Sequence, residues 1–157
     1  VENKEYWRQE PQKGKTQLEY NRRYYQEILD VVKAYKDYSI LGHLDVIKRY
    51  DLNGEIELEK IKDLIEQIFE VVIADGKGIE LNTSSRAYHL KSLMPSREIL
   101  ELYHDMGGKI ITIGSDAHNA DRVGDRVMES QKILKEIGFN GIYTFDQMKP
   151  KFHEFKF

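Results

Sequence analysis

Hydrophobic residues recur along the chain with two periods, one typical of amphipathic helices and one of short buried strands. The helical period predicts helices over residues 17–36, 58–74, 97–106, 121–137 and 146–153. Short apolar runs, several of them rich in β-branched residues, predict strands over residues 38–45, 78–82, 109–113 and 142–145. Residues 1–15 carry neither period and are expected to form a loop.

The boundaries of these segments carry start and stop signals. Thr16-Gln17-Leu18-Glu19 matches a capping box, which places the start of a helix at residue 17. Gly107-Gly108 and Gly138 follow two of the helical segments, and glycine is common just after a helix. Helices and strands therefore alternate strictly along the chain. This order predicts an α/β fold with parallel strands, either a barrel or a doubly wound sheet.

Three successive predicted strands end in the same way, with two polar residues separated by one position. The pairs are His43 and Asp45, Glu80 and Asn82, and Asp116 and His118. Side chains two positions apart in an extended chain point to the same side. Because the carboxyl ends of parallel strands meet at one edge of a sheet, we expect the three pairs to form one shared polar site.

The residue types in these pairs indicate metal binding. Imidazole and carboxylate groups without cysteine suit zinc, manganese or iron. Arg49 and Arg86 follow two of the strand ends, and arginine binds phosphate through two parallel hydrogen bonds. A metal site with arginines at its rim predicts hydrolysis of a phosphate ester. The alternative for the last pair is that Asp116 caps a helix and His118 is an ordinary loop residue.

Composition narrows the remaining classes of function. The 157 residues suffice for one domain with a buried core, and the net charge of −3 offers no broad basic surface for nucleic acid. The absence of cysteine excludes disulfides and cysteine-bound zinc, and it is compatible with a reducing cytoplasm. No apolar run approaches the roughly 20 residues that span a bilayer. We therefore expect a cytoplasmic protein that binds a small phosphorylated substrate, with no nucleic-acid or membrane partner.

Four segments occur in an order and spacing that match a known family. They are Leu41-Gly42-His43-Leu44-Asp45, Ile79-Glu80-Leu81-Asn82-Thr83-Ser84-Ser85-Arg86, Pro95-Ser96 before a helix, and Ile113-Gly114-Ser115-Asp116-Ala117-His118. Together they resemble the PHP (polymerase and histidinol phosphatase) superfamily, and most closely its histidinol-phosphate phosphatase branch. The resemblance implies a distorted, parallel-stranded (β/α)7 TIM-like barrel with up to three divalent metal ions at the strand carboxyl ends. It also implies hydrolysis of L-histidinol phosphate to L-histidinol and phosphate in histidine biosynthesis.

The resemblance further implies roles for individual residues. The implied metal ligands are His43, Asp116 and His118, of which Asp116 and His118 are also the implied catalytic residues. The residues implied to bind the substrate phosphate are Arg49 and Arg86. The residues implied to support the site are Asp45, Glu80 and Asn82.

The chain departs from the family pattern near its start. The family carries His-x-His on its first strand and further His and Glu ligands on the next strands, whereas no histidine precedes His43 here. We therefore expect residues 1–157 to be the C-terminal portion of a single PHP-type barrel domain. Such a portion leaves a sheet edge open, to be covered by a missing N-terminal half or by a second copy. The alternative functions are another PHP-type phosphoesterase activity and a truncated, non-catalytic interaction module.

Overall fold

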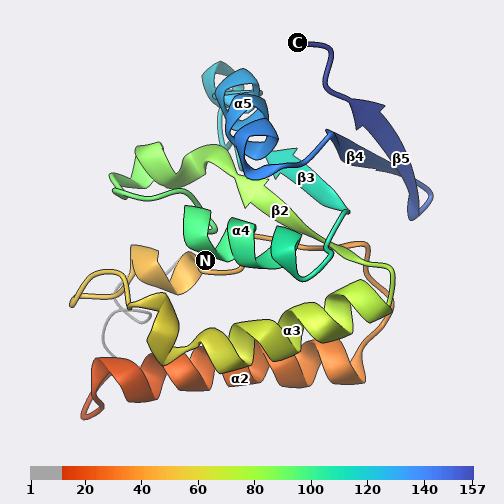
Figure 1. Cartoon of the computed structure of the whole chain (residues 1–157). Coiled ribbons are helices and arrows are strands. Elements are labelled where there is room, and N and C mark those ends of the chain that lie inside the picture. Colours follow the sequence, from red (N-terminus) through yellow and green to blue (C-terminus); the bar gives the residue numbers. More distant parts are fainter. Residues whose placement is uncertain (1–11) are drawn as a thin grey trace.

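A parallel sheet of three strands forms the centre of the fold in the computed structural model, which describes residues 12–157. The strands are β1 (Ile40–Leu41), β2 (Gly78–Asn82) and β3 (Ile111–Gly114), and β2 lies in the middle (Figure 1). Leu41 is aligned with Ile79, and Asn82 is aligned with Gly114. All three strands run in one direction and end toward the same edge. The α/β class is thus confirmed, and the described residues form an open sheet rather than a complete barrel.

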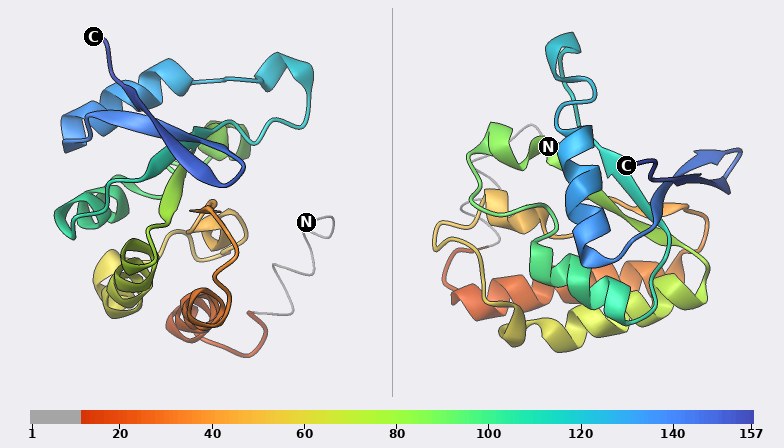
Figure 2. Two further views of the ribbon diagram at one scale, coloured as in Figure 1. Left: turned by 90° about the vertical axis from the view of Figure 1, so that its right-hand side faces the viewer. Right: turned by 45° about the horizontal axis from the view of Figure 1, so that its top comes forward.

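The helices follow one another around one side of this sheet (Figure 2). They are α2 (Gln17–Ala34), α3 (Lys62–Ala74), α4 (Arg97–Asp105) and α5 (Val127–Ile137). Short 3-10 turns are η1 (Val46–Arg49), η2 (Leu58–Lys60), η3 (Thr83–Tyr88) and η4 (Ala120–Arg122). No helix in the described part of the chain has the length and apolarity that a membrane crossing requires.

Ion pairs near both ends join α2 to α3. Arg22 contacts Asp63 at 2.7 Å near the start of the two helices, and Lys36 contacts Asp75 at 2.6 Å beyond their ends. The two helices therefore run parallel, as expected when a strand separates consecutive helices in a parallel α/β fold.

Alternation along β2 separates the core from the polar face of the sheet. Ile79 and Leu81 are fully buried and belong to one hydrophobic core with residues of α2, α3, α4 and α5. In that core, the rings of Phe69 and Tyr103 meet edge to face at 5.0 Å. Glu80 and Asn82 point to the opposite face, because successive side chains of a strand alternate between its two sides. The core thereby fixes the strand ends from which polar groups project.

The expected helix over residues 146–153 is wrong. The chain instead forms an antiparallel hairpin of β4 (Gly141–Asp146) and β5 (Lys149–Glu154), which lies beside β3 in Figure 1. Gln147 and Met148, between the strands, have φ values of 48° and 62°, which a two-residue hairpin turn of the primed type requires. The strand predicted over residues 142–145 is therefore present, but its partner is antiparallel.

Other predicted boundaries move by smaller amounts. The strand expected over residues 38–45 is reduced to β1, since the backbone leaves the extended region by His43, whose φ is 30°. The helix expected from residue 121 begins only at Val127, because Gly124 and Arg126 adopt left-handed backbone angles. Residues 1–11, part of the loop expected over residues 1–15, lie outside the described residues.

Candidate metal and phosphate site

A pocket of about 190 Å³ lies at the edge where the strands end. It is lined by Tyr24, His43, Val46, Ile47, Arg49, Tyr50, Tyr88, Asp116 and His118. Apart from Tyr24 of α2, the polar residues come from segments that follow β1, β2 and β3, which are far apart in the sequence but adjacent in the sheet. The structure therefore brings together the three residues expected to bind metal and one of the two expected to bind phosphate.

Sharp turns after β1 and β3 form the two ends of the pocket. His43 and Asp116 have φ values of 30° and 48°, which few residues other than glycine adopt. His118 is 76% exposed, and its Nδ1 lies 2.8 Å from the carbonyl oxygen of Asp116. A carbonyl oxygen only accepts hydrogen bonds, so Nδ1 is the donor in this contact. A histidine that donates through one ring nitrogen binds metal through the other, which here is Nε2.

Arg49 is the buried cation of the pocket, with 6% of its side chain exposed. Its Nη2 donates to Ser84 Oγ and, at 3.3 Å, to Asp116 Oδ2. The guanidinium carbon lies 3.9 Å from the centre of the Tyr88 ring. Arg49 Nε is buried and has no hydrogen-bond partner among residues 12–157. A buried donor without a partner is costly, and an anionic oxygen would satisfy it.

Glu80 and Asn82 stand next to the pocket and connect its parts. Glu80 Oε2 accepts hydrogen bonds from the His43 backbone N–H and from Asn82 Nδ2, both at 3.1 Å. Asn82 Oδ1 accepts from the backbone N–H of Ser84 at 3.0 Å and from the Ser84 hydroxyl. The expectation that Glu80 and Asn82 share a side holds. Sequence reasoning gave no role to Ser84, whose only signal is its place just after the strand-end pair.

Asp45 does not share the side of His43 and lies outside this pocket. Only 3% of its side chain is exposed, its Oδ2 lies 2.7 Å from Lys48 Nζ, and the same oxygen accepts the Ser96 backbone N–H at 3.0 Å. Burial raises the pKa of Asp45. The alternation rule fails here because β1 ends at Leu41, before the pair. Asp45 is part of a buried ion pair that joins η1 to the start of α4.

Arg86 also lies apart from Arg49. It is exposed on η3 and lines a separate hollow of about 510 Å³, together with Lys91, Arg97 and Arg126. Of the two arginines expected to bind phosphate, the structure places only Arg49 beside the strand-end pairs.

The donor types of His43, Asp116 and His118 suit a divalent metal, but their arrangement is incomplete. Within residues 12–157, no three histidine or acidic side chains converge closely enough to hold an ion. His118 Nδ1 lies 4.0 Å from Asp116 Oδ1. The same nitrogen contacts the backbone carbonyl of Asp116, so it is not free to bind a metal ion. These residues can contribute ligands to a metal centre, but the described part of the chain does not enclose one.

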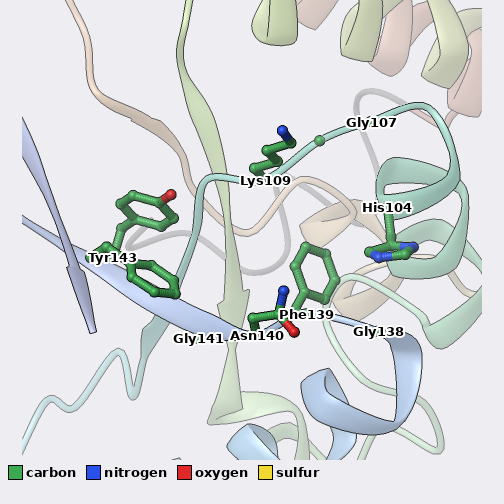
Figure 3. A pocket seen from close by; sticks show the side chains of 10 residues that line it. His104, Gly107, Lys109, Gly138, Phe139, Asn140, Gly141 and Tyr143 are labelled. Carbon is green, nitrogen blue, oxygen red and sulfur yellow. The ribbon is translucent and has the colours of Figure 1, made fainter. Parts of the chain in front are cut away.

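A second cavity, of about 320 Å³, differs in both place and chemistry (Figure 3). It lies where α4 and α5 end and β4 begins, beside the start of β3, so it opens at the other end of the strands. His104, Lys109, Phe139 and Tyr143 are among its lining residues, which include no carboxylate. A Cβ at Gly138 would lie 2.8 Å from the His104 ring, so packing against this ring explains the glycine without a bound ligand. Among residues 12–157, it offers neither a ligand set for a metal nor an unpaired buried donor.

The parallel sheet and a polar pocket at its carboxyl edge define an α/β protein of the kind that binds ligands where strands end. The sequence profile of the PHP domain matches residues 2–84, and the chain belongs to this family. The resemblance seen in the strand-end motifs is thereby confirmed.

Two curated relatives carry histidinol-phosphatase names. A probable histidinol-phosphatase of Thermotoga maritima is 35% identical over 118 residues, which are 75% of this chain and 48% of the relative. A histidinol-phosphatase of Lactococcus lactis is 30% identical over 138 residues, covering 86% of this chain and 51% of the relative. The chain thus spans about half the length of the relatives that it matches.

A crystal structure shows the same fold. The histidinol phosphate phosphatase of Lactococcus lactis, solved with zinc, L-histidinol and phosphate, superimposes with a TM-score of 0.77 at 28% identity. The match covers 90% of this chain and 54% of that chain. That relative therefore holds zinc and phosphate on a fold shared with this chain.

Proposed function

We propose that this chain forms part of a metal-dependent phosphoric monoester hydrolase, a histidinol-phosphatase that converts L-histidinol phosphate to L-histidinol and phosphate. The observation that carries the proposal is the buried Arg49, which lines a pocket together with His43, Asp116 and His118 and whose buried Nε has no partner among residues 12–157. The relative crystallised with L-histidinol and phosphate supports the choice of substrate.

In this proposal Arg49 binds the phosphate group. Its Nε donates to one phosphate oxygen, while stacking on Tyr88 and the hydrogen bond to Ser84 hold the guanidinium plane in place. Burial of the guanidinium strengthens this contact, because the charge is screened less by water than at the surface. Asp116 Oδ2, at 3.3 Å from Nη2, balances part of the charge before substrate binds.

His43, Asp116 and His118 would hold divalent metal, with zinc, manganese and iron all compatible with these ligands. A bound metal ion would supply Lewis-acid activation of the phosphoryl group. The chain's own residues orient the substrate and the metal: Arg49 fixes the phosphate, and His118, which is exposed and contacts the backbone through Nδ1, has Nε2 left to bind a metal. A complete centre of up to three ions needs further ligands, which we assign to an N-terminal half of the domain.

The domain assignment follows the same reasoning. We propose that residues 1–157 are the C-terminal portion of a single PHP-type (β/α)7 barrel. An N-terminal half, or a second copy at the open sheet edge, would complete the barrel and the metal centre. The proposed partners are thus a small phosphorylated substrate and the rest of the domain.

Activity is tested by phosphate release from L-histidinol phosphate with added Mn²⁺ or Zn²⁺, using the domain that contains this chain. We expect Asp116→Asn and His118→Ala to reduce turnover by at least about a hundredfold, since each removes a metal ligand. Unchanged turnover in both variants would contradict the proposal. A panel of other phosphate monoesters separates a histidinol-phosphatase from another PHP-type phosphoesterase.

Arg49 is tested by its affinity for inorganic phosphate. Arg49→Lys should weaken binding about tenfold or more, because lysine cannot replace the planar guanidinium. Arg23→Lys, on the exposed face of α2, is the matched control and should bind as the wild type does. The same titration of Arg86→Lys decides whether the second arginine takes part. A chain that binds neither phosphate nor metal would support the alternative of a non-catalytic interaction module.

A further inference from the structure

We propose that Ser84, Asn82 and Glu80 form a positioning relay that fixes Arg49 and His43 relative to each other, an inference that rests on the proposed function. Arg49 Nη2 donates to the Ser84 hydroxyl, and that hydroxyl donates to Asn82 Oδ1. Asn82 Nδ2 in turn donates to Glu80 Oε2. Four side chains thus form one continuous hydrogen-bonded chain from a guanidinium to a carboxylate.

The direction of donation is the same at every step of the relay. Each group donates its hydrogen bond to the next group on the Glu80 side. The positive end of the chain is therefore Arg49, and the negative end is Glu80. Hydrogen bonds arranged head to tail polarise one another and strengthen the whole chain. Glu80 therefore accepts the last hydrogen bond of a chain that begins at Arg49, and it does so without occupying Arg49 Nε.

Glu80 also holds the other side of the pocket. Its Oε2 accepts the backbone N–H of His43 at 3.1 Å, at a residue whose φ of 30° needs support from its surroundings. The carboxylate crosses over Gly114, where a Cβ would lie 2.0 Å from Oε1. One side chain of β2 thus joins the end of β1, the end of β3 and the relay to Arg49.

The relay is buried where it meets Arg49. Ser84 has no exposed surface and Asn82 is 1% exposed, so water cannot replace either partner. Among the described residues, removing the Ser84 hydroxyl would leave Arg49 Nη2 with only the 3.3 Å contact to Asp116. The guanidinium would then turn toward Asp116 and its Nε would lose the orientation that phosphate requires. Ser84 and Glu80 act through Arg49, and they do not touch substrate themselves.

The test uses the 157-residue chain and two measurements. The first is the ¹H–¹⁵N resonance of Arg49 Nε, assigned by its loss in Arg49→Lys, and the second is the dissociation constant for inorganic phosphate. Ser84→Ala and Glu80→Ala should each shift the Arg49 resonance and weaken phosphate binding about tenfold, as expected for a lost hydrogen bond to a charged group. The double variant should bind no more weakly than the weaker single variant, because both changes interrupt one chain.

Two further variants serve as controls. Glu80→Gln keeps an oxygen that accepts from His43 and Asn82. The Arg49 resonance and the phosphate affinity of this variant should therefore stay close to their wild-type values. Ser85→Ala changes the neighbouring serine, which lies outside the relay, and should leave both measurements unchanged. If Ser84→Ala fails to fold, as judged by circular dichroism, the comparison of Glu80→Ala with Glu80→Gln decides the outcome.

The possible results separate this inference from the proposed function. An Arg49 resonance that does not move in Glu80→Ala overturns the relay, and so do losses of affinity that multiply in the double variant. Absence of phosphate binding in the wild-type chain, with the resonance still shifting in both single variants, would support the relay and contradict the phosphate site.

Discussion

Lys48 and Arg49 are neighbours on η1, and both are buried, but their surroundings give them different roles. Lys48 Nζ contacts Asp45 at 2.7 Å, Glu55 at 3.1 Å and Ser92 Oγ at 2.9 Å. Arg49 has a single carboxylate nearby and an Nε without a partner among the described residues. A buried cation whose donors are all used has none left for a ligand, whereas one with an unused donor can still bind a ligand.

Two glycines beside Glu80 differ in how much space they leave. A Cβ at Gly114 would lie 2.0 Å from Glu80 Oε1, whereas one at Gly42 would lie 3.5 Å from Oε2, an ordinary contact. Gly114→Ala should therefore displace the Glu80 carboxylate and weaken phosphate binding about tenfold, the loss expected for one charged hydrogen bond. Gly42→Ala is the matched control and should bind normally. Equal affinities, measured by calorimetry, would show that Glu80 is not held against Gly114.

Asp45 gives the stability of the chain a dependence on pH. Burial raises its pKa in the folded state above 3.8, so the folded chain binds this proton more tightly than the unfolded chain does. The contribution of Asp45 to stability is full below pH 3.8 and is lost as the pH rises through the raised pKa.

Asp45→Asn removes this titration. The free energy of unfolding of the wild type, minus that of Asp45→Asn, should therefore fall as the pH rises above 3.8. Denaturant unfolding at a series of pH values measures the difference. A difference that grew with pH would mean that the pairing with Lys48 outweighs burial and lowers the pKa of Asp45.

Among the elements, those with a long period or clear boundary signals could be predicted from the sequence. The capping box at Thr16 and Glu19 is present with both of its hydrogen bonds, and α2 begins at Gln17 as expected. β2 matches its prediction over residues 78–82, since Ile79 and Leu81 alternate with Glu80 and Asn82. The convergence of the three strand ends could also be predicted, because parallel strands in one sheet end at the same edge.

The failures come from backbone conformations that the residue types do not signal. The hairpin turn at Gln147 and Met148 lacks the glycine or asparagine that usually marks positive φ. His43 likewise adopts a positive φ, which directs Asp45 away from the pocket. Ser84 was missed because its role depends on contacts with Arg49 and Asn82, which only the folded chain brings together.

The hairpin turn predicts that replacing methionine by glycine has opposite effects on stability in the turn and in α5. Met148→Gly, at φ 62°, should raise the free energy of unfolding by about 0.5 kcal/mol, because glycine adopts this conformation without steric cost. Met128→Gly, at an exposed position in α5, should lower it by about 1 kcal/mol, since glycine disfavours helices. Denaturant unfolding measures both. A loss at both positions would indicate that residues 146–153 are helical after all.

At the scale of the whole molecule, the open sheet is the dominant feature. β1 and β3 are its outer strands, and neither outer edge is hydrogen-bonded to another strand among the described residues, although β4 lies beside β3. The edge of β5 differs, because Lys149, Pro150 and Lys151 are residues that discourage pairing with another strand. Completion of the fold is therefore expected at the parallel sheet and not at the hairpin.

Light scattering after size-exclusion chromatography tests which partner completes the sheet. A second copy predicts a dimer whose population rises with concentration, since the interface would form between two chains. A clean monomer at all concentrations would contradict self-association and leave an N-terminal half as the completing segment. Lys151→Ala, on β5, is the control and should leave the mass unchanged.

The pocket draws its groups from three consecutive strand–helix units, none of which contains a usable site alone. If any one of these units detached from the sheet, its side chains would leave the pocket even while the other two units stayed folded. Ligand binding should therefore link the stabilities of these units: a bound phosphate ion would slow amide exchange in all three strands together, although it touches only their tips.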